Sequence, residues 1–325
     1  MWSWGRFMSV IETVNLCRSY GTRRGISNVN LKIAAGEIFG FLGPNGAGKS
    51  TAIRVLMGLL SAESGSARIF GKNCWKDGAS IRRDVGYVAG DVRLYSWLTT
   101  RSALGMLSRV HGRDLRSEGL ELAERFRLEP DLVVRKMSRG NRQKVALVLA
   151  LATSPKVLIL DEPTSGLDPL MQDTLMTCLR EFASLGHTVM FSSHTLSEVE
   201  TLCDHIAIVR DGGIVEDSSL AALKAKAPRQ IVLTLREDQQ VESIPWPPTV
   251  TVKYSPGRSE EAISSHAVLQ LAPSMKNRVC VLEMMGSSSS IVNWASAQNF
   301  ADVIIGPPSL EVLFRKYYEN TMETK

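Results

Sequence analysis

The stretch Gly-Pro-Asn-Gly-Ala-Gly-Lys-Ser-Thr at residues 43–51 constrains this chain more than any other part of its sequence. It fits the phosphate-binding loop pattern G-x-x-x-x-G-K-[ST], whose fixed positions here are Gly43, Gly48, Lys49 and Ser50. Glycines let successive backbone N–H groups point at phosphate oxygens, the lysine adds a charge for the β and γ phosphates, and the serine hydroxyl can bind magnesium. The stretch therefore predicts a site for a nucleoside triphosphate and Mg²⁺.

The sequence around this loop predicts a strand before it and a helix after it. Residues 37–42 form a short apolar run that is typical of a buried strand, and residues 50–60 carry apolar side chains at helical spacing. The N-terminus of that helix would face the phosphates with the positive end of its dipole. We therefore expect the whole loop to bind the nucleotide through Gly43, Pro44, Asn45, Gly46, Ala47, Gly48, Lys49, Ser50 and Thr51.

A second element of a nucleotide site follows at residues 155–163, an apolar run between two prolines that ends in Asp161 and Glu162. This pattern predicts a central parallel strand. At its carboxyl end Asp161 can hold magnesium, and Glu162 can orient and activate a water against the γ phosphate. Two acids after a strand are common in ordinary loops, but together with the phosphate loop they predict the second half of an NTPase site.

Three further residues are candidates whose roles the local sequence leaves open. Tyr20 lies ahead of the phosphate loop, where its ring can stack on a purine or pack on the core. Ser138 lies in a polar turn ahead of a strongly apolar helix at residues 145–152, where it suits the cap of that helix. His194 follows a strand at residues 188–192, where it can contact the γ phosphate or be a hydrogen-bonded structural histidine.

Apolar and polar patterning organises the rest of residues 10–220. Helical spacing at residues 100–111 and 118–126 predicts a helical insert over about residues 92–150. Alternating residues predict strands at 14–16, 29–33, 85–88, 206–210 and 214–216, the last two joined by the hairpin signal Asp211-Gly212-Gly213.

The pattern changes from residue 221 onwards, where we expect a separate small α+β domain over residues 221–325 that is regulatory or dimerising. Its expected elements are a short helix or linker at 221–227, strands at 231–235, 250–254, 268–271 and 279–283, a helix at 290–298, a break at Gly306-Pro307-Pro308 and a final helix at 310–318. Residues 1–9 are expected to be an N-terminal extension, within which Met8 is an alternative start.

Composition and length indicate an ordinary globular protein. The chain has 325 residues, 44% of them hydrophobic and 22% charged, and its longest apolar run is far shorter than the ~20 residues of a membrane-spanning helix. Five widely spaced cysteines without a C-x-x-C pair predict reduced, partly buried thiols in a cytosolic protein. The net charge of +5 is spread without a long basic run, which argues against nucleic acid as a main partner.

Taken together, these motifs resemble those of the nucleotide-binding subunit of ATP-binding cassette (ABC) transporters over roughly residues 10–220. The resemblance is carried by the phosphate loop, by Leu-Asp-Glu-Pro-Thr-Ser-Gly-Leu-Asp-Pro at residues 160–169 and by His194. It implies an α/β P-loop NTPase fold of the ABC cassette type. Such a fold has a RecA-like core, an antiparallel β subdomain and a helical insert, followed here by the small α+β C-terminal domain.

The resemblance also implies which residues bind ATP and Mg²⁺. Tyr20 would stack on adenine, Lys49 and Ser50 would serve the phosphates and the metal, and Asp161 would serve the metal. For hydrolysis, Glu162 would be the catalytic carboxylate, assisted at the γ phosphate by Lys49 and by the switch histidine, His194.

Dimer formation follows from the same resemblance. Met137-Ser138-Arg139-Gly140-Asn141 stands where the family has its signature Leu-Ser-Gly-Gly-Gln, and it retains Ser138 and Gly140, which would meet the γ phosphate of the opposite subunit. Asp168 belongs to the D-loop, which contacts the second subunit. Because the chain has one phosphate loop and one signature, two copies are expected to pair head to tail around two ATP molecules.

The largest departure from the family lies in Tyr87-Val88-Ala89-Gly90-Asp91, where Tyr-Leu-Pro-Gln-Glu is usual. Gly90 stands at the place of the glutamine and has no side chain to contact magnesium or water. Two explanations stay open. Either Asp91 takes over part of that task as a further metal ligand, or the coupling of hydrolysis to its output is looser here.

The string Ser-Arg-Gly-Asn-Arg-Gln-Lys at residues 138–144 and residues 307–318 resemble the drug and antibiotic exporter ATPases that pair with a separate ABC-2 type permease. The expected function is therefore ATP hydrolysis that drives such an integral membrane permease, with the chain peripheral on the cytoplasmic face of the cell membrane. The alternative is a soluble, non-transport ABC ATPase acting as a mechanical or regulatory factor. A GTP-driven switch is disfavoured because the sequence has no Asn-Lys-x-Asp motif.

Overall fold

The computed structural model describes residues 9–21, 23–256, 278–286, 288–308, 310 and 314. The chain divides into two compact units, Met1–Leu220 and Ala221–Lys325, and each has a hydrophobic core of its own. All five cysteines are free thiols and four of them are buried, as the sequence predicts. Within the described ranges, no helix is both long enough and apolar enough to cross a membrane.

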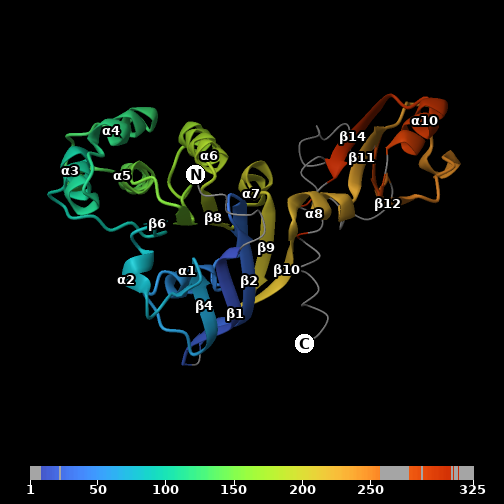
Figure 1. Cartoon of the computed structure of the whole chain (residues 1–325). Coiled ribbons are helices and arrows are strands. Elements are labelled where there is room, and N and C mark those ends of the chain that lie inside the picture. Colours follow the sequence, from blue (N-terminus) through green and yellow to red (C-terminus); the bar gives the residue numbers. More distant parts are fainter. Residues whose placement is uncertain are drawn as a thin grey trace. The chain divides into compact units, whose positions relative to one another are not determined.

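A six-stranded sheet with the order β10-β9-β3-β8-β7-β6 forms the centre of the first unit (Figure 1). Three neighbouring strands, β3, β8 and β7, pair in parallel and are fully buried, which is why their sequences are apolar without alternation. The strands are β3 (Ile38–Leu42), β6 (Val85–Val88), β7 (Val157–Asp161), β8 (Thr188–Ser193), β9 (His205–Arg210) and the antiparallel edge strand β10 (Gly213–Ser219). The carboxyl ends of β3, β7 and β8 lie at one edge, and the candidate site is built there.

A second, antiparallel sheet with the order β2-β1-β4-β5 belongs to the same unit. Its strands are β1 (Ser9–Tyr20), β2 (Arg23–Ala34), β4 (Ser64–Ile69) and β5 (Lys72–Asn73). The strands predicted at residues 14–16 and 29–33 lie within β1 and β2. Strand β4 was not predicted because its sequence, Ser-Gly-Ser-Ala-Arg-Ile, buries only Ala67 and Ile69 and so lacks a clear alternation.

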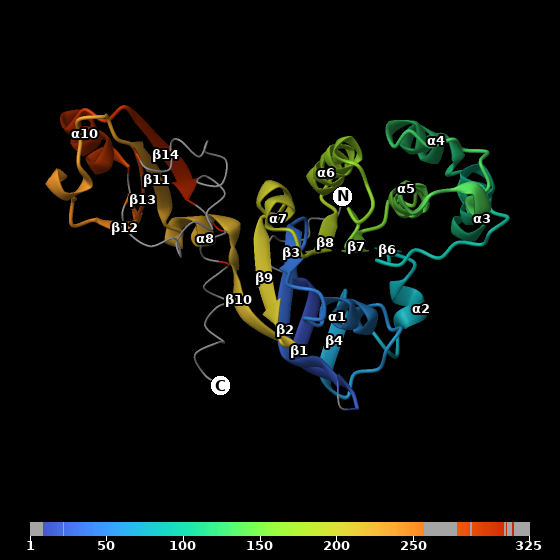
Figure 2. The ribbon, with the colours of Figure 1, turned by 180° about the vertical axis from the view of Figure 1, so that it is seen from behind.

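Helices cover the sheets of this unit, and three of them, α3, α4 and α5, pack on one another to one side (Figure 2). The helices are α1 (Lys49–Leu56), α2 (Gly78–Ile81), α3 (Thr100–His111), α4 (Arg116–Arg125), the 3₁₀ turn η1 (Val134–Lys136), α5 (Arg139–Ala152), α6 (Pro169–Ser184) and α7 (Leu196–Leu202). The helix predicted at residues 50–60 is therefore shorter, because Gly58 takes a left-handed conformation with φ 65° and ends it.

Helix α5 also corrects a prediction. The polar residues ahead of the apolar segment 145–152 were expected to form a turn, but residues 139–144 are helical and Ser138 is the N-cap. The hydroxyl of Ser138 accepts a hydrogen bond from the backbone N–H of Asn141 at 3.2 Å, as expected for a capping serine. The signature residues therefore occupy the first turn of a rigid helix.

In its described residues, the second unit is a four-stranded antiparallel sheet of order β12-β13-β11-β14 with one helix packed on it. Its elements are β11 (Arg229–Thr234), η2 (Val241–Ser243), β12 (Val250–Tyr254), β13 (Val279–Met284), α10 (Ser289–Gln298) and β14 (Asp302–Pro308), preceded by α8 (Leu220–Lys226). The prediction that Gly306-Pro307-Pro308 interrupts the secondary structure is wrong. These residues form the last part of β14, at the sheet edge, where proline is tolerated. The predicted strand 268–271 and most of the predicted helix 310–318 lie outside the described residues.

Candidate functional site

The phosphate loop is held in place by backbone contacts with two neighbouring segments. The N–H of Gly43 donates to the carbonyl of Ser193 at the end of β8, and the N–H of Gly212 in the β9–β10 hairpin donates to the carbonyl of Ala47. Gly48 has φ 107°, and a Cβ atom there would lie 2.7 Å from the carbonyl oxygen of Gly25. The loop conformation therefore requires glycine at position 48 for both backbone angle and space.

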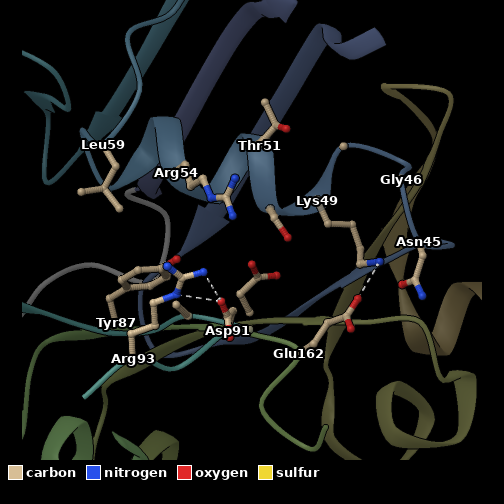
Figure 3. A pocket seen from close by; sticks show the side chains of 15 residues that line it. Asn45, Gly46, Lys49, Thr51, Arg54, Leu59, Tyr87, Asp91, Arg93 and Glu162 are labelled. Carbon is tan, nitrogen blue, oxygen red and sulfur yellow. Dashed lines mark hydrogen bonds and ion pairs between the residues drawn. The ribbon is translucent and has the colours of Figure 1, made fainter. Parts of the chain in front are cut away.

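Lys49 is almost completely buried, with 4% of its surface exposed. Its ammonium Nζ donates to the carbonyls of Gly43 at 2.7 Å and Pro44 at 3.1 Å, and it lies 3.2 Å from Oε1 of Glu162 (Figure 3). These three oxygens satisfy the three donors of the ammonium, which makes a buried charge tolerable. The structure thus joins the cation of the phosphate loop to the acid that follows β7.

The two acids at the end of β7, Asp161 within the strand and Glu162 directly after it, have different surroundings. Asp161 is 3% exposed, and its Oδ1 accepts a hydrogen bond from the hydroxyl of Ser192 at 2.7 Å. Glu162 has φ 48°, a strained backbone conformation held by a bond of its N–H to the same hydroxyl at 3.0 Å. The second carboxylate oxygen of Glu162 lies 3.4 Å from Nδ1 of His194, so Glu162 lies between Lys49 and His194.

A cavity of about 760 Å³ opens at the carboxyl edge of the parallel sheet (Figure 3). This volume is within the range of small-molecule sites. The lining combines residues of the phosphate loop, of α1, of the segment after β6 and of the end of β7: Asn45, Gly46, Gly48, Lys49, Ser50, Thr51, Arg54, Leu59, Tyr87, Ala89, Gly90, Asp91, Arg93, Asp161 and Glu162.

The cavity brings together most of the predicted phosphate residues and the predicted metal residues, but not all predicted site residues. Three residues of the predicted phosphate loop, Gly43, Pro44 and Ala47, are not part of its lining, and neither are Tyr20, Ser138, Gly140, Asp168 and His194. Tyr20 is 41% exposed at the end of β1 and so is not packed in the core. Asp168 is the N-cap of α6, and its Oδ1 accepts a hydrogen bond from the backbone N–H of Met171 at 3.0 Å. Neither Ser138 nor Asp168 therefore belongs to the Lys49 site of its own chain.

The segment after β6 supplies lining residues that sequence reasoning missed. The Nε of Arg93 donates to Oδ2 of Asp91 at 3.0 Å, its Nη2 forms an ion pair with the same oxygen at 3.0 Å, and both side chains are largely exposed (Figure 3). A Cβ atom at Gly90 would lie 3.7 Å from Oδ2 of Asp161, so a side chain at this position would contact that carboxylate. Burial, and then the charge of Asp161, raises the pKa of Tyr87 above its ordinary value.

Arg54 is another lining residue that was missed, although its position could have identified it. It follows Ser50 by four residues on α1, and residues with that spacing share one helix face. Its guanidinium adds a further cation to the cavity, beside those of Lys49 and Arg93. No comparable local signal marks Arg93 or Ser192, whose contacts depend on how strands and loops meet.

The donor set fits Mg²⁺ bound together with a nucleotide. Ser50 and Asp161 offer a hydroxyl and a carboxylate to the same cavity. No group of three or more His, Cys, Asp or Glu side chains suited to a metal occurs in the described part of the chain. Magnesium commonly takes only one or two protein ligands and fills its remaining positions with phosphate oxygens and water, so two donors suffice.

Comparisons with known proteins identify the family of this chain. The family model described as "ABC transporter" matches residues 26–165. The bacitracin transport ATP-binding protein BcrA of Bacillus licheniformis is 34% identical over 236 residues, which cover 71% of this chain and 77% of that protein. The daunorubicin/doxorubicin resistance ATP-binding protein DrrA of Streptomyces peucetius is 31% identical over 235 residues, 71% of each chain.

Solved structures resemble the first unit. A structure titled "ATP binding subunit of ABC transporter" is 28% identical, with a TM-score of 0.63 over 67% of this chain and 93% of that one. The ATP-binding cassette MJ0796, solved as a dimer in a post-hydrolysis state with ADP and Pi, is 25% identical, with a TM-score of 0.60 over 65% of this chain and 98% of that one. The first unit therefore has the ABC cassette fold, and the antiparallel domain that follows is additional.

Proposed function

Because this chain belongs to the ABC transporter family of ATP-binding proteins, we propose that two copies close around two ATP molecules and drive a separate ABC-2 type permease. The observation that carries the proposal is the gathering of Lys49 and Ser50 with Asp161 and Glu162 at one cavity. These pairs come from distant parts of the sequence, and each supplies half of what phosphoryl transfer to water requires.

Hydrolysis is assigned to side chains that follow β7 and β8, together with Lys49 of the phosphate loop. Glu162 orients the attacking water and accepts its proton, while Lys49 and His194 stabilise the charge that develops on the γ phosphate. Asp161 and Ser50 would hold Mg²⁺, which would neutralise negative charge on the phosphates. Ser192 fixes the Asp161 carboxylate and the Glu162 backbone, so that both acids keep one geometry.

The second half of each ATP site is assigned to the partner copy. Ser138, which is exposed, and Gly140, which is half-buried, lie at the N-terminus of α5, and this position suits an anion because the helix dipole is positive there. We assign these residues to the γ phosphate of the partner's ATP, Asp168 to the contact between copies and Tyr20 to adenine. Support comes from the resemblance and from the relatives solved as dimers.

A groove of about 480 Å³ is assigned to the permease. It lies between β6 and helices α3 and α5, and apolar side chains such as Leu98, Ala103 and Met106 line it. Tyr95 and Trp97 stack with ring centroids 5.7 Å apart, although Tyr95 is 73% and Trp97 57% exposed. Exposed aromatic side chains beside an apolar groove are typical of a protein interaction site.

The class of cargo and the location follow from the relatives and remain part of this proposal. BcrA and DrrA are named for bacitracin transport and daunorubicin/doxorubicin resistance, which favours export of a drug, antibiotic or similar small molecule. The chain would then work on the cytoplasmic face of the cell membrane, bound to its permease. We assign a regulatory or dimerising role to residues 221–325, which form a separate compact unit.

The test is coexpression with the neighbouring gene product, if that product has about six apolar segments of spanning length. We expect the chain to hydrolyse ATP whether or not that protein is present. We expect it to be retained on membranes only when that protein is present. Tyr95→Ser should reduce retention while leaving the ATP turnover of the isolated chain unchanged. Turnover without membrane retention would contradict the transport role and support a non-transport ATPase, and absence of turnover would contradict both.

A further inference from the structure

The first two turns of α5 are held by direct contacts against the segment that follows Glu162. The side-chain amide of Gln143, which is 3% exposed, donates to the carbonyl of Pro163 at 3.2 Å. One turn earlier, a Cβ atom at Gly140 would lie only 2.4 Å from the carbonyl oxygen of Gly166. The backbone of the signature therefore rests directly on the backbone of the segment 163–166, with no room for a side chain between them.

Arg139 adds a third contact at the same place. Its Nη2 donates to the hydroxyl of Ser165 at 3.2 Å, and a Cβ atom at Gly166 would lie 3.9 Å from its Cγ. The aliphatic part of the arginine thus lies over Gly166 while its guanidinium reaches Ser165. The family signature has glycine at this position, so a side chain that can make such a contact is a departure of this chain.

This segment connects a residue that the proposed function assigns to the chain's own ATP with one that it assigns to the contact between copies. It runs from Glu162, which acts on the chain's own ATP, to Asp168 at the contact between copies. The signature that rests on it, with Ser138 at its cap, meets the partner's ATP. A shift of α5 caused by the partner's nucleotide would therefore be passed to residues 163–166, which directly follow Glu162.

We propose that Arg139 is a positioning residue that couples the two ATP sites of the dimer through its hydrogen bond with Ser165. The inference rests on the proposed head-to-tail dimer and adds a route by which occupancy of one site adjusts the carboxylate of the other. Gln143 and Gly140 hold α5 against residues 163–166. Arg139, at the exposed N-terminus of α5, sets the orientation of the helix on these residues.

The rival role is a direct one, in which the positive charge of Arg139 contacts the γ phosphate of the partner's ATP. The two roles differ in their dependence on Ser165. A positioning role requires the acceptor hydroxyl, whereas a direct charge contact does not. They also differ in kinetics, because a lost charge at a phosphate weakens ATP binding at any occupancy, whereas lost coupling changes the cooperativity between sites.

The experiment measures ATP turnover of the full-length protein against ATP concentration for Arg139→Met, Arg139→Lys, Ser165→Ala and the double variant Arg139→Met/Ser165→Ala. Lys76→Met, which removes an exposed cation from a distant loop, is the control. Wild-type protein should show a Hill coefficient above 1, with an upper limit of about 2 for two sites. Arg139→Met and Ser165→Ala should each lower it toward 1, with kcat reduced about three- to tenfold.

The double variant should be no worse than either single variant, because both remove the same hydrogen bond. Arg139→Lys should retain most of the cooperativity, since an ammonium can also donate to Ser165. A Ser165→Ala variant that keeps the wild-type Hill coefficient would overturn the proposal, as would losses that add up in the double variant. Absence of ATP turnover in the wild-type protein would instead overturn the proposed function itself.

Discussion

The ammonium of Lys49 lies 3.2 Å from a carboxylate oxygen of Glu162, so the cation of the phosphate loop and the proposed catalytic acid are partners. Lys49 is 4% exposed, and Glu162 also approaches His194 at 3.4 Å. In the proposed site, phosphate oxygens of ATP would take the place of the Glu162 carboxylate at Lys49. Binding of the triphosphate would at the same time release Glu162 to act on water, so the two events are linked by one ion pair.

Replacing Glu162 with glutamine should separate binding from hydrolysis. The amide keeps the size of the side chain but neither competes for the Lys49 charge nor accepts a proton. We expect ATP affinity equal to or higher than that of wild type, stable ATP-dependent dimers, and turnover reduced by about 10²- to 10⁴-fold. Equilibrium binding, size-exclusion chromatography with ATP and phosphate release measure the three quantities. Brisk turnover in this variant would remove Glu162 from the catalytic role.

Ser192→Ala should impair catalysis through both acids at once. Its hydroxyl donates to Asp161 at 2.7 Å and accepts from the N–H of Glu162 at 3.0 Å. Loss of a hydrogen bond to a charged group corresponds to about 1.5–3 kcal/mol, so we expect kcat to fall at least about tenfold. Steady-state turnover at saturating ATP and Mg²⁺ measures the effect.

Thr13→Val is the matched control for that variant. It also removes a buried hydroxyl, which donates to the carbonyl of Val29 at 3.0 Å, but in the antiparallel sheet away from the cavity. Both variants should lose stability, and only Ser192→Ala should lose turnover in the folded protein. Equal turnover in the two variants would mean that Ser192 does not position the acids.

Asp91→Ala tests whether this carboxylate replaces the side chain that Gly90 lacks. We expect a several-fold higher Mg²⁺ concentration for half-maximal turnover, because one oxygen ligand near the metal is lost. Arg93→Met is the contrasting variant. It frees Asp91 from an exposed ion pair of little energy and should leave the Mg²⁺ requirement unchanged or lower it. If Asp91→Ala has wild-type turnover, Mg²⁺ dependence and coupling to the permease, Asp91 has no such role.

Asp217→Asn should change how stability depends on pH. The hydrogen bond to Asp217 at 2.7 Å, followed by the charges of Asp217 and Glu37, raises the pKa of His205. A raised histidine pKa contributes stability that is fully present below the ordinary value of about 6.5 and is lost as pH rises through the folded value. The variant should therefore be less stable than wild type near pH 6, by no more than about 1 kcal/mol because water screens the pair, and should approach wild type near pH 9.

Chemical denaturation at both pH values measures this difference. His205→Gln should flatten the pH dependence in the same way, because it removes the titrating ring itself. A deficit of Asp217→Asn that is equal at pH 6 and pH 9 would show that the pair contributes without a titrating charge.

The sequence by itself determined the parts of this protein whose chemistry is local. The phosphate loop needs glycines, a lysine and a serine at fixed spacing, and the two acids follow a strand that is apolar because it is buried on both faces. Hairpin residues Asp211 and Gly212 adopt positive φ where their types predict it. Such features follow from backbone conformation within a few residues, so a linear pattern records them.

Only the tertiary structure decided which of these parts meet. The contacts of Lys49 with Glu162 and of Ser192 with Asp161 depend on strands β3, β7 and β8 lying side by side in parallel register. Arg139 and Gln143 of α5 form hydrogen bonds with the segment after Glu162. These hydrogen bonds depend on how α5 packs against the end of that sheet. No spacing in the sequence encodes these distances, because they arise from pairing and packing between residues far apart along the chain.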